Sequence, residues 1–383
     1  MIEKLIWEKF KNININDVFF SSLKEDYPEF CEWYNKKHEE EALTYSDENG
    51  LHAFMYLKKE TESIILADKI MPAIDRLKIG TLKLDDSIKG QRLGEGFIGV
   101  ALWTWQKLKV PEIYLTVFPK QKQLIELLKK FGFTSQGKKP NGEIILLKNR
   151  NSIDYTTPYT SFPFIDPKTK SAGLIPIKDF FHDRLFPYSD TPLKLKNLEE
   201  TTAGNGITKI YIGTPYTITH YRPGEVVFIY RMHTGDGQKG NLSAVTSFCV
   251  ITKITTIKHN GRELISFQDY LKEAGNKTVF TEDELRNIFK ASNTILIYST
   301  KPQGIILGEV HVLNIISGSP TFIWEKTKSY AGITREKYRQ YFKGCKIAFA
   351  YCLDTPVLFN PSKSLSEFGI HYSPQSYIYI RNL

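Results

Sequence analysis

A strand that runs into a glycine-rich loop and then a helix is the feature that most restricts the fold of this chain. Residues 82–96 read LKLDDSIKGQRLGEG, with Gly94 and Gly96 in the first turn of the expected helix. The unpaired amides and the positive dipole end of such a helix favour a bound phosphate. Lys89 and Arg92 add positive charge to the loop. The spacing fits neither a Walker A loop nor a G-x-G-x-x-G fingerprint, so the loop is a phosphate site of another kind or an ordinary turn.

The elements around this loop predict an α+β domain with a mixed sheet that ends near residue 150. Apolar periodicity predicts a helix at 16–41, strands at 42–47, 51–59, 63–70 and 76–84, a helix that runs from the loop to 109, a strand at 112–118, a helix at 120–133 and a strand at 143–148. Helices and strands in this order form a layered α/β structure around one core.

This order resembles the GNAT superfamily of N-acetyltransferases over residues 1–150. The pyrophosphate loop of that superfamily reads R/Q-x-x-G-x-G/A. Lys89–Gly94 fits it with lysine at the first position and Arg92 at a position where relatives often have glycine, and Gln91–Gly96 fits it in full. Phe131-Gly132-Phe133 matches the bulky-residue-Gly-Phe ending of the last helix.

The resemblance implies acetyl-CoA as cofactor. Pantetheine would pair with the backbone at Leu82 and Leu84, between the fourth and fifth expected strands. The pyrophosphate would lie on the loop and the helix start, which are formed by Lys89, Gly90, Gln91, Arg92, Leu93, Gly94, Glu95 and Gly96. Residues 61–150 hold 16 basic and 9 acidic residues, a net charge of +7 that suits an anionic cofactor.

The catalytic residues are less evident. Many relatives have a tyrosine four residues before the glycine of the Gly-Phe ending, and this chain has Leu128 there. We name Tyr114, on the short strand at 112–118, and Asp75, just before the strand at 76–84, as catalytic candidates. A tyrosine in a strand also serves packing, and an aspartate at a strand end is also commonly solvated. Glu39-Glu40-Glu41 would attract a cationic acceptor or simply end a solvated helix.

The rest of the chain divides into a proline-rich connector at 151–205 and a strand-rich region at 206–383. Many short strands with glycine and proline turns predict a small β-barrel with helical insertions. The run Tyr221–Arg231 and the helix that ends in Tyr341-Phe342-Lys343-Gly344 before a strand resemble the PUA-like superfamily, in particular its ASCH and EVE branches.

That second resemblance implies that the region binds RNA or modified nucleic acid in a basic cleft lined by aromatic residues. The candidates are Arg222, Arg231, Lys239, Trp324, Tyr330 and Arg335. Each of them has an alternative role as a surface cation or a core aromatic. The whole chain carries 51 basic and 42 acidic residues, while residues 1–60 hold 8 and 13, so the basic excess lies beyond the N-terminal segment.

Other features point to a soluble, cytoplasmic protein. No run of about 18 uncharged apolar residues is present, and the first residues, MIEKLIWEKF, lack the apolar core of a secretory signal. Cys31, Cys249, Cys345 and Cys352 form no CxxC pair, and the histidines show no metal-ligand spacing, so we expect free thiols and no metal.

Together these observations predict an acetyl-CoA-dependent N-acetyltransferase whose second domain binds RNA. The acceptor would be an amine on RNA, on aminoacyl-tRNA or on an RNA-associated protein. Two alternatives stay open: a non-catalytic CoA-sensing module that binds nucleic acid, and a small-amine acetyltransferase whose barrel is a protein-interaction scaffold. The sequence leaves the oligomeric state undetermined.

Overall fold

The structure is a computed structural model. It describes residues 4–189, 195, 202–213, 221–235, 237, 240–259, 262–291, 294–300, 302–368 and 370–372. The chain forms two compact units. The first unit contains residues 1–212, 217–254 and 276–279, and the second contains residues 213–216, 255–275 and 280–383. Each unit is described here by itself.

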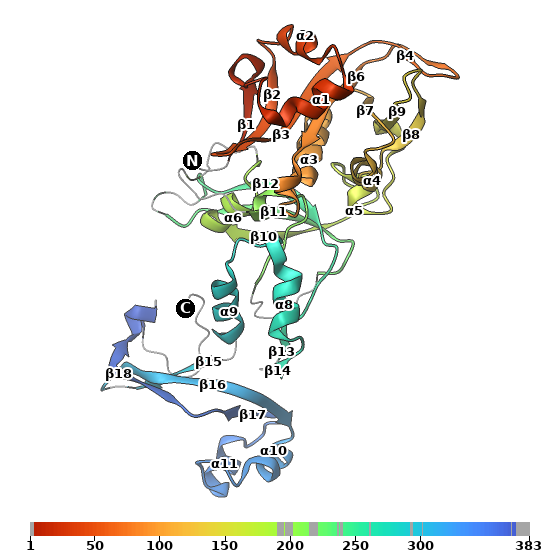
Figure 1. The fold of residues 1–383 in the computed structure, drawn as a ribbon. Helices are drawn as coiled ribbons and strands as arrows, with labels where there is room; N and C mark the ends of the chain where they lie inside the picture. The colour runs from red at the N-terminus through yellow and green to blue at the C-terminus, as the bar shows by residue number, and fades with distance from the viewer. Residues whose placement is uncertain are drawn as a thin grey trace. The chain divides into compact units, whose positions relative to one another are not determined.

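A seven-stranded mixed sheet dominates the first unit (Figure 1). Its strand order is β1-β2-β3-β6-β7-β9-β8, and only the β6–β7 pair is parallel. The strands are β1 (Lys4–Lys9), β2 (Glu41–Asp47), β3 (Gly50–Glu60), β6 (Arg76–Leu84), β7 (Glu112–Val117), β8 (Thr134–Lys138) and β9 (Ile144–Asn149). The mixed-sheet α+β fold predicted for this part of the chain is confirmed.

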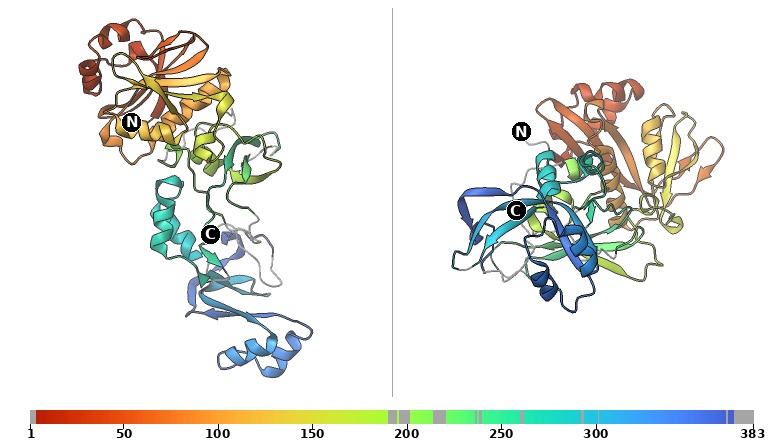
Figure 2. Two further views of the ribbon diagram at one scale, coloured as in Figure 1. Left: turned by 90° about the vertical axis from the view of Figure 1, so that its right-hand side faces the viewer. Right: turned by 90° about the horizontal axis from the view of Figure 1, so that it is seen from below.

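Helices cover both faces of this sheet, and Figure 2 shows these layers from two further sides. One face packs against α3 (Leu93–Leu108) and α4 (Lys122–Lys130) through a core that contains Leu77, Ile79 and Trp105. The other face carries an aromatic core under short helical segments: η1 (Phe10–Asn12), η2 (Val18–Phe20), α1 (Ser21–Asp26) and α2 (Phe30–Asn35).

Two predicted elements of this unit differ in the structure. The single helix expected at 16–41 is broken into short helices, because Pro28 follows the end of α1 and cannot donate a helical hydrogen bond. The strand expected at 63–70 is a small hairpin of β4 (Ile64–Ile65) and β5 (Ile70–Met71), closed by a turn in which the Leu66 amide donates to the Lys69 carbonyl. Strands β1 and β8 were not predicted.

A three-stranded sheet also belongs to the first unit and joins the expected connector to the strand-rich region. Its order is β10-β11-β12, with β10 parallel to β11. Strand β10 lies in the segment 151–205, whereas β11 and β12 lie beyond residue 206, so the two segments share one sheet. The three strands are β10 (Ala172–Lys178), β11 (Val226–Met232) and β12 (Ala244–Val250). The first unit also contains η3 (Asp86–Ile88), η4 (Arg150–Ser152), α5 (Pro158–Ser161), α6 (Asp179–Leu185) and α7 (Thr202–Asn205).

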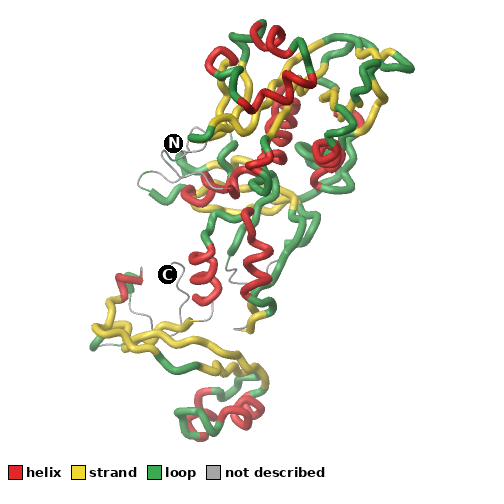
Figure 3. The backbone as a smooth tube through the Cα atoms, in the orientation of Figure 1, coloured by secondary structure: helices red, strands yellow, loops and turns green. Residues whose placement is uncertain are grey.

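The second unit contains a four-stranded antiparallel sheet and helices, which Figure 3 separates by colour. Strand β16 is central and pairs with β15, β17 and β18. The elements are β13 (Lys258–His259), β14 (Arg262–Glu263), α8 (Phe267–Ala274), α9 (Glu282–Ala291), β15 (Thr294–Ser299), β16 (Ile305–Gly318), α10 (Pro320–Thr327), α11 (Arg335–Tyr341), β17 (Ala348–Leu353), β18 (Val357–Ser364) and η6 (Leu365–Phe368), with η5 (Gly275–Lys277) at the boundary between the units. The strand-rich composition is confirmed, but the described residues form open sheets and contain no closed barrel.

Candidate functional site

Strand β6 has a free edge beside the only parallel pair of the large sheet. The β6–β7 ladder runs from Arg76–Glu112 to Ile79–Leu115 and then ends, although β6 continues to Leu84. Within the described part of the chain, the β7 side of residues 80–84 therefore has no strand partner. Such an edge can pair with an extended ligand. Leu82 and Leu84 lie on this segment, as predicted, with their side chains half-buried against the core.

A β-bulge marks the point where the two strands separate. In the β3–β6 register, Tyr56 lies opposite Thr81 and Leu57 lies opposite Ile79, which leaves Gly80 as the extra residue. The bulge shifts the inward-facing positions of β6 from odd to even, so Leu77 and Leu82 face the same core. A Cβ atom on Gly80 would lie 2.8 Å from the Tyr56 ring, so a larger residue there would require the ring to shift.

The loop after β6 turns unpaired amides toward the end of that edge. Gly90 has φ +87° and Arg92, which precedes α3, has φ +62°. Within the described residues, the amides of Arg92, Leu93, Gly94 and Glu95 donate to no protein acceptor. They lie at the positive end of a 16-residue helix, which favours an anion there. In the alignment of Lys89–Gly94 with the motif, Arg92 occupies the glycine position, and its backbone conformation is one that favours glycine.

The carbonyl side of the same loop is held by residues far along the chain. Asn205 Nδ2 donates to the Gln91 carbonyl at 3.1 Å, and Asn276 Nδ2 donates to the Gly90 carbonyl at 2.6 Å. The Arg92 guanidinium donates to the Thr208 carbonyl at 2.5 Å. All these residues belong to the first unit. Sequence analysis missed these residues because no local pattern connects them to the loop.

The charged residues of the loop are largely paired. Lys89 pairs with Asp86 at 2.9 Å and is exposed, so it remains accessible to an anion. Glu95 lies in the first turn of α3 and pairs with Arg92 at 3.3 Å and with Lys130 at 3.0 Å. Burial alone would raise the pKa of Glu95, but Lys130 and its other partners hold that pKa below its usual range. The carboxylate is therefore ionised and neutralised by its neighbours.

The two glycines of the helix start have different surroundings. A Cβ atom on Gly94 would lie 3.2 Å from Leu127 of α4 and 3.8 Å from Leu84 of β6, so Gly94 faces the space between these elements. A Cβ atom on Gly96 would lie 2.1 Å from the Asn205 carbonyl oxygen. Gly96 therefore allows the chain around Asn205 to pack against α3, which is a structural reason for glycine rather than contact with a cofactor.

Helix α4 supplies no hydroxyl group. Leu128 is fully buried in the core, and the helix ends where the Phe133 amide donates to the Leu128 carbonyl and Gly132 adopts φ +80°. Glycine at this position avoids the Cβ penalty of the left-handed conformation. Phe131 and Phe133 on either side are buried, which explains the Phe-Gly-Phe pattern.

The structure does not bring the two catalytic candidates together. Tyr114 is 3% exposed and its hydroxyl donates to Glu60, while burial and that carboxylate raise its pKa. Asp75 is exposed and binds Thr61 Oγ1 at 2.6 Å and Lys59 Nζ at 3.1 Å. Neither side chain lines a pocket beside the bulge.

Two hollows lie on the face of the sheet that carries α1 and α2. One, of about 300 Å³, is beside the bulge and is lined by Trp33, Lys36, Lys37, Tyr56, Lys58, Lys78 and Gly80. The other, of about 370 Å³, is lined by Glu25, Asp26, Phe118, Pro119 and Lys120. The sequence feature that could have indicated the hollow beside the bulge is the switch from odd to even apolar positions at Gly80, because such a switch indicates a bulge.

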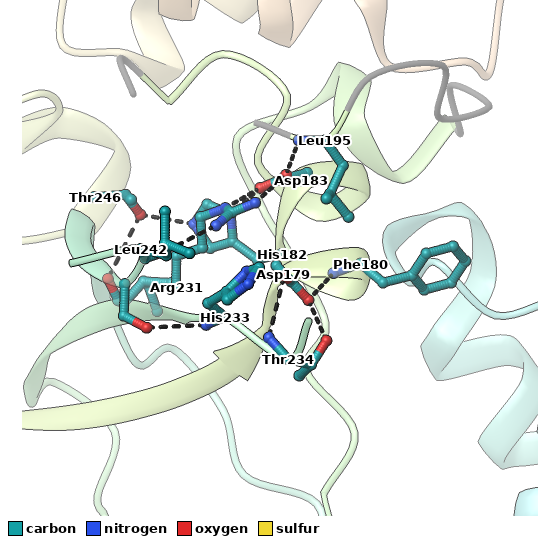
Figure 4. A network of polar contacts seen from close by, with 12 residues as sticks. Asp179, Phe180, His182, Asp183, Leu195, Arg231, His233, Thr234, Leu242 and Thr246 are labelled. Carbon is teal, nitrogen blue, oxygen red and sulfur yellow. Dashed lines mark hydrogen bonds and ion pairs between the residues drawn. The ribbon is translucent and has the colours of Figure 1, made fainter. Parts of the chain in front are cut away.

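Arg231, predicted to contact nucleic acid, is instead buried in a polar network (Figure 4). Its Nε and Nη2 atoms donate to the two carboxylate oxygens of Asp183 at 2.8 and 2.9 Å. His182 bonds Asp183 at 2.8 Å through Nδ1 and Thr246 at 2.7 Å through Nε2. The prediction for Arg231 is wrong, because a buried arginine in a two-pronged carboxylate pair presents no charge to a ligand.

The other nucleic-acid candidates are divided between the units. Arg222 is exposed in the first unit. In the second unit Tyr330 is 91% exposed and Arg335 is exposed, whereas Trp324 packs against Tyr338 with ring centroids 5.0 Å apart. Lys239 lies outside the described residues.

Two kinds of site are not found in the described part of the chain. No three histidine, cysteine, aspartate or glutamate side chains there group closely enough to hold a metal ion. Among the same residues, no helix is long and apolar enough to cross a lipid bilayer.

Comparison with known proteins gives partial matches. No family model matches the chain. It is 24% identical over 113 residues to the large ribosomal subunit protein uL22 of Ureaplasma parvum, a match that covers 28% of this chain and 36% of that protein. The chain thus spans about a third of the length of this curated relative.

Several solved structures are similar to parts of this chain. An ASCH protein from Zymomonas mobilis is 25% identical and covers 22% of this chain and 60% of its own, with a TM-score of 0.20. A GNAT-family acetyltransferase from Listeria monocytogenes is 19% identical and covers 38% and 94%, with a TM-score of 0.29. The PaiA N-acetyltransferase of Thermoplasma acidophilum in complex with coenzyme A is 18% identical and covers 38% and 99%, with a TM-score of 0.26. The structures similar to this chain thus include both GNAT acetyltransferases and an ASCH domain.

Proposed function

We propose that this protein is an acetyl-CoA-dependent N-acetyltransferase with a nucleic-acid-binding C-terminal region. The observation that carries the first part is the continuity of the free β6 edge at residues 80–84 with the unpaired amides of Arg92 to Glu95. An extended pantetheine chain needs backbone partners, and a pyrophosphate needs converging N–H donors. The two sets of groups follow one another along the chain in the order that such a cofactor requires.

The residues present fit this cofactor. Gly94 adds no side chain beside Leu127 of α4 and Leu84 of β6, and Lys89 adds an accessible ammonium group beside the amides. When bound, acetyl-CoA supplies an activated acetyl group for transfer to an amine. The chain itself would bind pantetheine through the backbone near Leu82 and Leu84 and would hold the phosphates at the start of α3.

Calorimetric titration of the full-length protein with CoA tests the proposal. Gly94→Val should lower CoA affinity at least about tenfold, because the branched side chain would fill the space beside Leu127 and Leu84. Gly332→Val is the matched control, since nothing lies within 4 Å of a Cβ atom there. If the folded Gly94→Val protein bound CoA as tightly as the parent, the site would lie elsewhere.

We favour an N-acetyltransferase over a CoA-sensing module that does not react. The observation that favours the sensor is Leu128, which is buried in the core and supplies no hydroxyl group for catalysis. Thiol release from acetyl-CoA in the presence of a panel of amines distinguishes the two functions. CoA binding without release for any amine would favour the sensor.

Nucleic-acid binding by the C-terminal region rests on exposed cations and one exposed aromatic. Arg222 and Arg335 are exposed, and Tyr330 is free to stack on a base. The acceptor would then be an amine on RNA, on aminoacyl-tRNA or on an RNA-associated protein. The competing function for this region is a protein-interaction scaffold, which predicts no RNA affinity at low salt.

A further inference from the structure

The hollow beside the bulge has a chemistry that identifies the acceptor more closely. We infer that it binds an acidic group of the acceptor, a carboxylate or a phosphate, so that the substrate is an amine that also carries a negative charge. This inference rests on the proposed acetyltransferase function and deepens it.

The hollow lies beside the free edge of β6 at residues 80–84. Gly80 forms one wall, and Gly80 is the bulged residue at which β6 leaves β7 and its free edge begins. Tyr56 and Trp33 form an aromatic wall, with ring centroids 5.7 Å apart. An acceptor in this hollow would therefore lie next to the reacting end of a ligand paired with residues 80–84.

The lining contains four lysines and no carboxylate: Lys36, Lys37, Lys58 and Lys78. Lys58 and Lys78 are direct cross-strand partners in the β3–β6 register. Like charges in that relation destabilise a sheet, so their proximity calls for a compensating negative charge.

The protein supplies that compensation for three of the four lysines. Lys36 pairs with Glu32 at 2.5 Å, Lys37 pairs with Glu40 at 3.0 Å, and Lys58 pairs with Glu60 and with Glu62 at 3.1 Å each. Lys78 is half-buried over the Tyr114 ring, with its Nζ 5.7 Å from the ring centroid. No carboxylate of the described residues lies within ion-pair distance of Lys78 Nζ, although Glu60, which pairs with Lys58, interacts with Lys78 electrostatically at longer range. Lys78 is therefore the lysine of the lining that has no direct ion pair and that a ligand anion would bind.

Tyr56 adds the one hydroxyl group of the lining. It donates to Glu40 and accepts from Lys37 Nζ at 2.9 Å, so its orientation is fixed.

The acids at 39–40 bind lysines of the protein itself, since Glu39 pairs with Lys9 and Lys11 and Glu40 pairs with Lys37. They are occupied within the protein rather than displayed to a cationic acceptor.

The second hollow does not compete for this role. Its cation, Lys120, already pairs with Asp26 at 2.5 Å, and its remaining charged lining residue is Glu25. It carries no unneutralised positive charge for an acidic acceptor.

Matched amines test the inference in the full-length protein. β-Alanine against β-alaninamide isolates a carboxylate, and O-phosphoethanolamine against ethanolamine isolates a phosphate. We expect at least one acidic amine to bind in calorimetry and to be acetylated with a KM about tenfold below that of its neutral partner. The pair of amines that shows this difference in KM distinguishes a carboxylate ligand from a phosphate ligand.

Variants locate the effect. Lys78→Met should remove the preference for the acidic amine, raising its KM about tenfold while leaving calorimetric CoA affinity unchanged. Lys59→Met is the control, because Lys59 is the next residue to Lys58 but pairs with Asp75 and is absent from the lining. Equal use of acidic and neutral amines, or an unchanged preference in Lys78→Met, would overturn the inference. Absence of CoA binding by the parent would instead contradict the proposed function.

Discussion

The side-chain amide of Asn276 donates a hydrogen bond to the carbonyl of Gly90 at 2.6 Å, across 186 residues of sequence. Asn205 holds the next carbonyl, that of Gln91, in the same way. Because a peptide group is planar and trans, fixing the Gln91 carbonyl also fixes the direction of the Arg92 N–H, one of the free amides of the loop. Residues outside the seven-stranded sheet therefore set the geometry of the loop between β6 and α3.

Asn205→Ala should weaken CoA binding about two- to tenfold, the cost of one lost hydrogen bond that orients the loop. Affinity for pantetheine, which lacks the pyrophosphate, should not change. Calorimetry with both ligands measures the difference, and the exposed Asn151→Ala is the control. An equal loss for CoA and pantetheine would indicate general damage to the fold.

Gly132→Ala should destabilise the protein more than Gly142→Ala. Both glycines have positive φ, +80° and +86°, so both substitutions incur the left-handed penalty of roughly 1–2 kcal/mol. Only at Gly132 would the new Cβ also meet backbone, 2.9 Å from the Thr160 carbonyl. Urea unfolding measures the difference between the two variants. Equal midpoints would show that the Thr160 segment moves aside freely.

The Asp183–Arg231 pair should make stability depend on acid pH. Burial alone would raise the pKa of Asp183, but hydrogen bonds from Arg231, the Leu195 amide and His182 hold that pKa below its usual range. The folded pKa is thus below the unfolded value of about 3.9. The stabilisation is present above that value and is lost as the pH falls through the folded pKa.

The free energy of unfolding should therefore fall as the pH drops below about 4, and Asp183→Asn should flatten that part of the profile. At neutral pH the same variant leaves Arg231 buried without its anion, which costs about 3–5 kcal/mol. A profile with the same slope in both proteins would show that other carboxylates dominate acid unfolding.

Tyr114→Phe should affect stability rather than chemistry. The hydroxyl is buried and committed to Glu60, so its loss costs about 1–3 kcal/mol for the carboxylate that it leaves short of a donor. The acetylation kcat of the folded variant should stay within about threefold of the parent. A tenfold fall in kcat with unchanged CoA affinity would return Tyr114 to the catalytic role predicted from the sequence.

Substitution of Arg222 or Arg335 should weaken nucleic-acid binding directly, whereas Arg231 should make no contact with the nucleic acid. Arg222→Glu and Arg335→Glu should lower affinity for a short single-stranded RNA and reduce the steepness of its salt dependence, as loss of phosphate contacts does. Fluorescence anisotropy of the full-length protein at several salt concentrations measures both. Arg231→Glu should instead unfold the network around Asp183. A folded parent with no RNA affinity at low salt would favour the scaffold function.

Local patterns predicted much of the large sheet and its loop. The strand at 76–84 and the Phe131-Gly132-Phe133 helix end follow from periodicity and from the φ that glycine permits, and both are confirmed. The break at Pro28 could also have been read from the sequence, because proline cannot continue a helix. The strands β1 and β8 were missed because their sequences alternate too weakly to indicate which face is buried.

The remaining site features depend on contacts between distant residues. Nothing near Arg231 in the sequence indicates Asp183, 48 residues earlier, and a buried arginine has the same local pattern as an exposed one. The lysines beside the bulge became a group only when the β3–β6 register placed Lys58 opposite Lys78. Register and polar pairing are tertiary properties, and composition alone does not fix them.

The close approach of Asn205 to Gly96 has a consequence for how this protein can be divided. A chain cut after residue 150 would keep all seven strands but would lose the segment that lies over Gly96 and Gly99 of α3. That cut would remove Ile207 and expose the apolar surface of α3 that it covers at Gly99. It would also remove the hydrogen bonds that Asn276 and Asn205 donate to the carbonyls of Gly90 and Gln91. The seven-stranded sheet alone therefore lacks the residues that hold the loop between β6 and α3, because Asn205 and Asn276 both lie beyond residue 150.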